Sequence, residues 1–242
     1  FGNPRNESRG TGWTNENWLK SRFHFSFAEY RNPKNTQFGC LRVMNDDLVQ
    51  GMRGFGMHPH RDVEIMTYIV DGKLTHADSL NHGEKQTLGR GSVQFMTAGT
   101  GIQHSEHNLN ESPLRFIQMW ITPRAYGYEP AYGGFDGGSS EAVAARKNKL
   151  AQLVGDAKDS SCAAPVKLQQ DCALYVADLE PSAKVTLELK PKRQAYVLCV
   201  EGNINASDGN SPSGSLHLER HDAAEVRGEG KLCLEAKADT PS

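Results

Sequence analysis

The sequence lacks the features that mark membrane proteins and nucleic-acid-binding proteins. No apolar run approaches the roughly 18 residues that a transmembrane helix needs. The chain also has no basic block, and its net charge is -2, so no stripe of cations is available to neutralise a phosphate backbone. We therefore expect no membrane span and no direct contact with nucleic acid.

Cysteine is scarce as well. The chain has five cysteines, an odd number, and none forms a C-x-x-C pair. This pattern predicts reduced thiols in an intracellular compartment, and it argues against a disulfide framework or a cysteine zinc cluster. The cytoplasm is the favoured location, with the nucleus or an organelle as alternatives. The cysteines are Cys40, Cys162, Cys172, Cys199 and Cys233.

Glycine, in contrast, is abundant, with 24 residues. Short runs rich in β-branched and aromatic residues repeatedly end at glycine, asparagine, aspartate or proline, which is typical of an all-β barrel or sandwich. This series of short strand-like runs stops at a glycine-rich stretch after residue 127, and a second series begins near residue 166. We therefore predict two β-domains, over residues 1–130 and 166–242, joined by a connecting segment over residues 131–165.

The composition of the connecting segment suits one helix. Residues 141–155 contain several alanines, and Ser140 and Gly155 are suitable start and stop residues. A strand over residues 149–155 is the alternative.

The stretch "HPHRDVE" at residues 58–64 carries the first chemical signal. Residues two apart on a β-strand point to the same face, so His58 and His60 would present two imidazoles on one side. Glu64 would point the same way if the strand continued that far. Three potential ligands on one strand face suggest a metal.

A second pair, His104 and Glu106, repeats this spacing in a glycine-rich context. Together with His58 and His60 it would supply three imidazoles and a carboxylate, a set that suits a divalent Fe, Mn, Ni, Cu or Zn ion. The lack of cysteine in the set argues against a structural zinc site. His76, His82 and His107 are expected to be ordinary hydrogen-bonded residues. His217 and His221, in the second half of the chain, are not expected to be metal ligands, because they have no H-x-H pair and no partner glutamate nearby.

These motifs resemble those of the pirin family, the pirin-like bicupins of the cupin superfamily. The resemblance rests on "GFGMHPHRDVEIMTYIVDG", "HADS", "VQFMTAGTGIQHSEHN", "RFIQMWITP" and "QDCALYVADL", and it spans nearly the whole chain. It implies two tandem cupin barrels, which are double-stranded β-helices or jelly rolls. One metal, favoured as Fe(II), would lie in the N-terminal barrel only, held by His58, His60, His104 and Glu106. Glu64 is the alternative fourth ligand.

The family is similar to quercetin 2,3-dioxygenases, so the resemblance implies O2-dependent ring cleavage of a flavonol with release of carbon monoxide. Glu106 would then also be the base that accepts the proton of the substrate hydroxyl. The protein is expected to be a monomer. The alternative is an iron-dependent, redox-sensitive regulator that binds a transcription factor or a metabolic enzyme. Apolar residues near the motifs could line the pocket or simply pack in the core: Phe55, Met57, Phe95, Met96 and Ile102.

Overall fold

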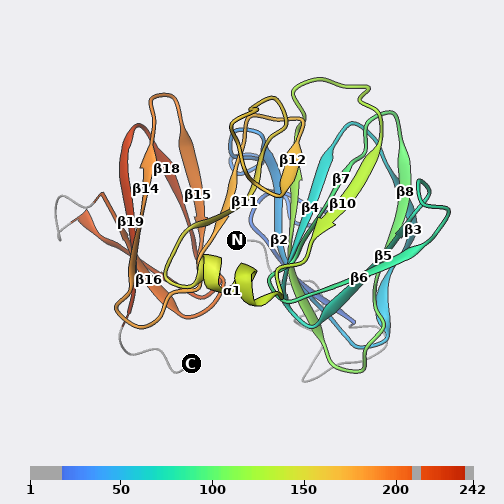
Figure 1. Cartoon of the computed structure of the whole chain (residues 1–242), viewed down its shortest axis with the longest axis horizontal. Helices are drawn as coiled ribbons and strands as arrows, with labels where there is room; N and C mark the ends of the chain where they lie inside the picture. Colours follow the sequence, from blue (N-terminus) through green and yellow to red (C-terminus); the bar gives the residue numbers. More distant parts are fainter. Residues whose placement is uncertain (1–17, 209–213, 238–242) are drawn as a thin grey trace. The chain divides into compact units, whose positions relative to one another are not determined.

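The chain is almost entirely β-structure. This computed structural model describes residues 18–208 and 214–237, which divide into two compact units (Figure 1). The first unit contains the described residues up to Ser139 together with Leu153–Leu174. The second contains Ser140–Gln152 and the described residues from Tyr175 onward. Within the described part of the chain, no helix has the length and apolar character of a transmembrane span.

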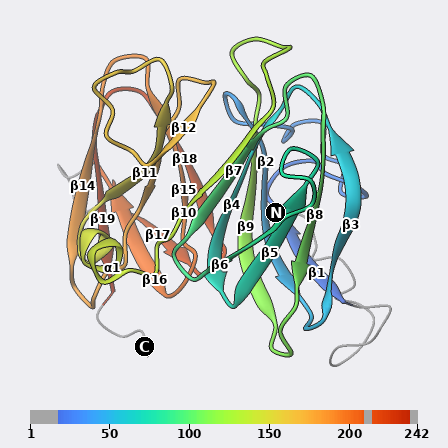
Figure 2. The same cartoon turned by 45° about the vertical axis from the view of Figure 1, so that its right-hand side comes forward.

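The first unit is built from two antiparallel sheets that face each other (Figure 2). One sheet has the strand order β1-β2-β9-β4-β7-β10, and the other has the order β3-β8-β5-β6. The six strands of the first sheet are β1 (Leu19–Phe23), β2 (Leu41–Val49), β4 (Glu64–Asp71), β7 (Val93–Thr97), β9 (Leu114–Ile121) and β10 (Ala131–Phe135). The four strands of the second are β3 (Arg53–His60), β5 (Lys73–Asp78), β6 (Lys85–Gly89) and β8 (Ile102–Asn108).

The core of this unit lies between the two sheets. On most strands alternate residues point inward, and the inward side chains of both sheets form one apolar cluster. Phe116 and Ile69 from the larger sheet pack there with Leu74 and Leu88 from the smaller one. Burial of such side chains contributes roughly 1.5–3 kcal/mol each, so the cluster fixes the sheets against each other.

The strand that carries His58 and His60 ends sooner than the sequence suggested. Strand β3 stops at His60, the chain turns through Asp62 at a φ of 53°, and Glu64 begins β4 in the opposite sheet. The prediction that Glu64 shares a strand face with the two histidines is therefore wrong. The left-handed conformation at Asp62, which aspartate tolerates better than most residues, allows the chain to leave the strand there.

The predicted helix also ends early. Helix α1 (Ser140–Arg146) begins at the expected serine but has only seven residues, and β11 (Ala151–Asp156) follows it. Asn148, at a φ of 54°, breaks the helix, and β11 pairs in parallel with β12 (Val166–Leu168). The alternative strand prediction for this region is confirmed, because tertiary pairing outweighs the helical propensity of the segment.

The second unit is also built from β-strands. It has a four-stranded sheet of order β14-β19-β16-β17 and a two-stranded sheet of β15 and β18. Strands β11, β12 and β13 (Leu174–Val176) form a separate three-stranded sheet, and β12 and most of β11 belong to the first unit. The other strands are β14 (Lys184–Leu189), β15 (Gln194–Leu198), β16 (Asn203–Ser207), β17 (Leu216–Glu219), β18 (Ala223–Arg227) and β19 (Gly230–Ala236). His217 lies exposed on β17 beside Asn205, and His221 is in the turn that follows. Neither belongs to a metal-ligand cluster among the described residues.

Candidate metal centre

Three histidines meet where β3 pairs with β8. The register places His58 directly opposite His104, and His60 lies two residues further along β3. The ring centroid of His104 is 4.4 Å from that of His58 and 4.9 Å from that of His60, and one nitrogen from each of the three rings lies within 4.8 Å of the others. His104 is buried, whereas His58 and His60 are partly exposed. The cluster therefore has one closed side and one side open to solvent.

Glu106 is two residues after His104 on β8, and its carboxylate forms hydrogen bonds with side chains of the larger sheet. Gln94 donates from Nε2 to Glu106 Oε1 at 2.7 Å, and Gln118 donates from Nε2 to Oε2 at 2.8 Å. The Thr67 hydroxyl is 3.2 Å from Oε1 and 2.6 Å from Gln118 Oε1, and its single hydrogen can serve only one of them. Burial raises the pKa of Glu106, while the donors from Gln118, Thr67 and Gln94 and the nearby His58 act to lower it.

Two of the three histidines, His60 and His104, have lowered pKa values that favour the neutral form. Burial, together with the charge of His58, lowers the pKa of His60 to about 4, and burial with the neighbouring histidines lowers the pKa of His104 to about 2. Metal-binding imidazoles must be neutral, so both rings are competent at neutral pH. His58 Nδ1 lies 2.7 Å from the carbonyl oxygen of Gly56, and donating to it leaves Nε2 with a free lone pair.

The ring nitrogens of His104 show that the site fits a metal. Both are buried, and neither has a hydrogen-bond partner among the described residues. A buried polar group without a partner costs about 1–3 kcal/mol. A divalent ion that accepts nitrogen and oxygen ligands would satisfy one of these nitrogens, and the donor set around it matches such an ion.

A second group of potential ligands shares two of these side chains. His76 on β5, His104 and Glu106 are all buried, and their ligand atoms lie within 4.8 Å of one another. The ring of His76 is stacked on Tyr132, with centroids 4.0 Å apart and planes 6° apart. As predicted from the sequence, His76 does make a hydrogen bond, with Asp78 Oδ2 at 2.9 Å, but its place in this group was not foreseen.

Glu64 belongs to neither ligand group among the described residues. It is fully buried and accepts hydrogen bonds from the Thr97 hydroxyl at 2.9 Å and from the backbone N–H of Gln169 at 3.3 Å. Its hydrogen bonds therefore hold it to β7 and to the segment after β12 rather than to the histidines.

The five residues predicted as pocket lining have different surroundings. Phe55 is partly buried against the apolar core cluster, with its ring 5.2 Å from that of Trp18. Met57 is 54 % exposed, and Phe95 lies over Gly133. Met96 and Ile102 are buried in one small cluster, against which Trp120 packs.

An aromatic pair beside His60 was not predicted from the sequence. The Trp120 ring lies edge-on to His60 with centroids 5.0 Å apart, and Phe27 lies edge-on to Trp120 at 5.5 Å. Both rings are only partly buried. They form an aromatic wall beside the half-exposed histidines.

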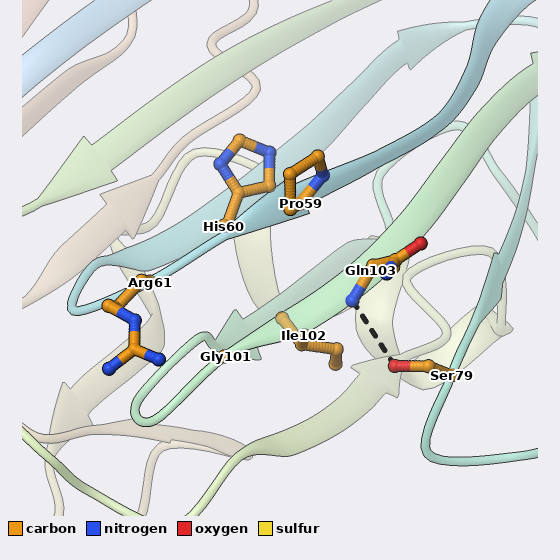
Figure 3. A pocket seen from close by; sticks show the side chains of 7 residues that line it. All are labelled: Pro59, His60, Arg61, Ser79, Gly101, Ile102 and Gln103. Carbon is orange, nitrogen blue, oxygen red and sulfur yellow. Dashed lines mark hydrogen bonds between the residues drawn. The ribbon is translucent and has the colours of Figure 1, made fainter.

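A cavity of about 400 Å³ adjoins the end of β3 (Figure 3). Gln103 and Pro59 are opposite each other in the β3–β8 ladder, and their exposed side chains alternate with the inward-pointing His104, His58 and His60. We therefore place this cavity at the outer face and edge of the sheet, next to His60, rather than between the three imidazoles. Its lining residues are Pro59, His60, Arg61, Ser79, Gly101, Ile102 and Gln103.

Three inward imidazoles and a carboxylate on paired strands of a two-sheet β-barrel are the arrangement expected of a cupin-type metal site. The sequence matches the family description "Pirin" over residues 4–121 and "Quercetinase C-terminal cupin domain" over residues 156–241. The chain belongs to the pirin family, and the expected all-β fold of two cupin domains is confirmed.

Its relatives are similar over most of their length. A protein named "Pirin-like protein" from Caulobacter vibrioides is 34% identical over 94% of this chain and 92% of its own. The "Quercetin 2,3-dioxygenase" of Escherichia coli K12 is 37% identical over 80% of this chain and 79% of its own. The crystal structure of the bacterial pirin YhhW from Escherichia coli in complex with nickel(II) superposes with a TM-score of 0.76 and 32% identity, covering 94% of this chain and 91% of that one.

Proposed function

We propose that this protein is a metal-dependent dioxygenase that cleaves a flavonol-type aromatic substrate with O2, as a quercetin 2,3-dioxygenase does. The observation that carries the proposal is the cluster of the partly exposed His58 and His60 with the buried His104, beside the ring of Trp120. The three histidines thus offer metal ligands next to an aromatic ring, and two of them are accessible to solvent. The name of the Escherichia coli K12 relative supports the same chemistry.

The ligands that we assign are His58, His60, His104 and Glu106, for one ion per chain. A bound divalent metal supplies Lewis acidity and open coordination positions for an anionic substrate oxygen. Fe(II) is our favoured ion, and Mn, Ni, Cu or Zn accept the same nitrogen and oxygen ligands. The nickel in the YhhW structure shows that a related protein binds such an ion.

The chain's own residues have three roles in this proposal. Trp120, supported by Phe27, packs against the flat substrate and orients its hydroxyl group toward the histidines. Glu106 accepts the proton of that hydroxyl. Gln94 and Gln118 hold the Glu106 carboxylate in one orientation, so that little reorganisation is needed when the proton moves.

The test is oxygen uptake with simultaneous detection of carbon monoxide, using Fe(II)-loaded protein and quercetin. We expect both signals from the wild type and from His217→Ala, which removes an exposed histidine on β17 far along the chain. We expect neither from His60→Ala. If wild-type protein shown to hold one metal per chain takes up no oxygen, the dioxygenase proposal is wrong and the regulator hypothesis is favoured.

A further inference from the structure

His76 has one nitrogen in use and one that is free. Its Nε2 lies 2.9 Å from Asp78 Oδ2, so Nε2 carries the hydrogen and donates it to the carboxylate. Nδ1 is then an acceptor, and it is buried without a partner among the described residues, on a side chain that is 2 % exposed. A histidine fixed by a carboxylate on one nitrogen and free on the other is arranged as metal-ligating histidines are.

The surroundings of His76 fix its ring without using Nδ1. The parallel stack on Tyr132 holds the plane of the ring, and the Tyr132 hydroxyl donates to Gln86 Oε1 at 2.6 Å. Asp78 is fixed in turn, because its Oδ1 accepts the backbone N–H groups of Leu80 and Asn81 at 2.8 and 3.0 Å. The direction of the Nδ1 lone pair is therefore set by the fold before any ligand binds.

Two further potential ligands lie beside the His76 ring. The ligand atoms of His76, His104 and Glu106 all lie within 4.8 Å of one another. Glu106 accepts at most three hydrogen bonds from its neighbours, whereas a carboxylate has about four lone-pair sites, so one site remains for an ion. Two imidazoles and one carboxylate with open positions are the ligand set of non-heme Fe(II) sites.

We propose that His76, His104 and Glu106 form an inner metal position, with Asp78 orienting His76. It differs from the outer position assigned above, at His58, His60, His104 and Glu106, by using His76 in place of His58 and His60. The inference rests on the barrel being a metal centre, as in the proposed function. It adds that the centre can hold an ion without His58 or His60. Because His104 and Glu106 belong to both positions, the loss of His104 weakens both.

The experiment uses the full chain and Co(II) as the probe. The double variant His58→Ala/His60→Ala removes two outer ligands and leaves the inner group intact. Co(II) bound per chain is measured by elemental analysis after desalting, together with the visible d–d spectrum of the ion. His76→Phe in this background keeps an aromatic ring against Tyr132 but removes both nitrogens, and His217→Phe is the matched control for loss of one histidine.

We expect the double variant to retain Co(II), the added His76→Phe to abolish binding, and the added His217→Phe to leave it unchanged. Asp78→Asn keeps the Oδ1 contacts of the turn but replaces the acceptor of His76, and it should weaken binding about 10- to 100-fold in the same background. If the double variant does not fold, as judged by its thermal unfolding, single His58→Asn and His60→Asn backgrounds replace it.

Two results would overturn the inner position. One is a folded double variant that loses Co(II) as completely as His104→Ala does. The other is retained Co(II) that does not depend on His76. Both leave the proposed function standing if the wild type binds Co(II), whereas a wild type that binds none refutes the metal centre as a whole.

Discussion

The Gln118 side chain offers the sharpest test of how the protein holds Glu106, the carboxylate that we propose binds the metal. Gln118→Leu has a similar volume but removes the Nε2–H that donates to Glu106 Oε2 at 2.8 Å and the Oε1 that lies 2.6 Å from the Thr67 hydroxyl. Gln94 still donates a hydrogen bond to Oε1, whereas the hydrogen bond from Gln118 to Oε2 is lost. The carboxylate can then rotate about the remaining hydrogen bond.

The size of the effect follows from the strength of that bond. A hydrogen bond to a charged group contributes roughly 1.5–3 kcal/mol. Loss of an oriented partner behind a metal ligand weakens metal affinity about 10- to 100-fold, which corresponds to about 1.4–2.8 kcal/mol at 1.4 kcal/mol per factor of ten. The two ranges agree, so we expect a 10- to 100-fold weaker Ni(II) affinity. The metal-free protein should also unfold about 3–12 °C lower.

The assay is a competition titration of Ni(II) against a chelator, with calorimetric unfolding of the metal-free protein. Gln103→Leu is the matched control, because Gln103 lies exposed on the same β3–β8 ladder and makes no side-chain contact with Glu106. Unchanged or tighter Ni(II) binding in a Gln118→Leu protein that folds normally would refute the reasoning. It would mean that the amide competes with the metal for the carboxylate instead of orienting it.

Three further predictions concern the surroundings of the centre. His104→Leu replaces a buried ring whose nitrogens lack partners, so the metal-free protein should unfold at a higher temperature than the wild type, while Ni(II) should no longer raise that temperature; a lower melting point without metal would contradict this. Burial raises the pKa of Glu64 above its ordinary value of 4.5. The contribution of Glu64 to the free energy of unfolding is therefore fully present below pH 4.5, and it is lost as pH rises through the pKa of the folded state. Glu64→Gln should therefore gain stability relative to the wild type between pH 4.5 and neutrality in urea unfolding, and a constant difference would argue against a raised pKa. Gly99→Ala should destabilise the fold by more than about 2 kcal/mol, because its φ is +47° and the new Cβ would lie 1.9 Å from the backbone oxygen of Tyr128. Gly83→Ala, at a φ of +80° with open space around it, should cost only about 1 kcal/mol, and equal losses for the two glycines would contradict the steric argument.

The sequence predicted the parts of the centre that depend on local geometry. The spacing of His58 and His60, and of His104 and Glu106, places each pair on one strand face whatever the rest of the fold does. Glu64 was misplaced because the same spacing rule was applied across Asp62, where the chain turns into another sheet. A period-two pattern gives no information once the strand has ended.

The side chains contributed by other strands were beyond this reasoning. Gln94, Gln118 and Trp120 approach the centre only because of how the two sheets face each other, and no short motif encodes that register. One signal was nevertheless present. Gln94 and Gln118 each interrupt an otherwise largely apolar strand, and an amide in such a place requires a polar partner opposite. The inward-pointing Glu106 is that partner.

The link from Glu106 to the opposite sheet also determines when during folding the centre can exist. Its hydrogen-bond partner Thr67 is 39 residues away along the chain, and the ladder that joins His58 to His104 closes a loop of similar length. Contacts of such long sequence separation form slowly, because the entropy of loop closure is lost before the contact contributes any favourable free energy. The ligands are therefore scattered in the nascent chain and become a pocket only when both sheets have docked. An ion bound at the proposed site would thus be acquired late, and it would be selected by a finished barrel and not by an unfolded chain.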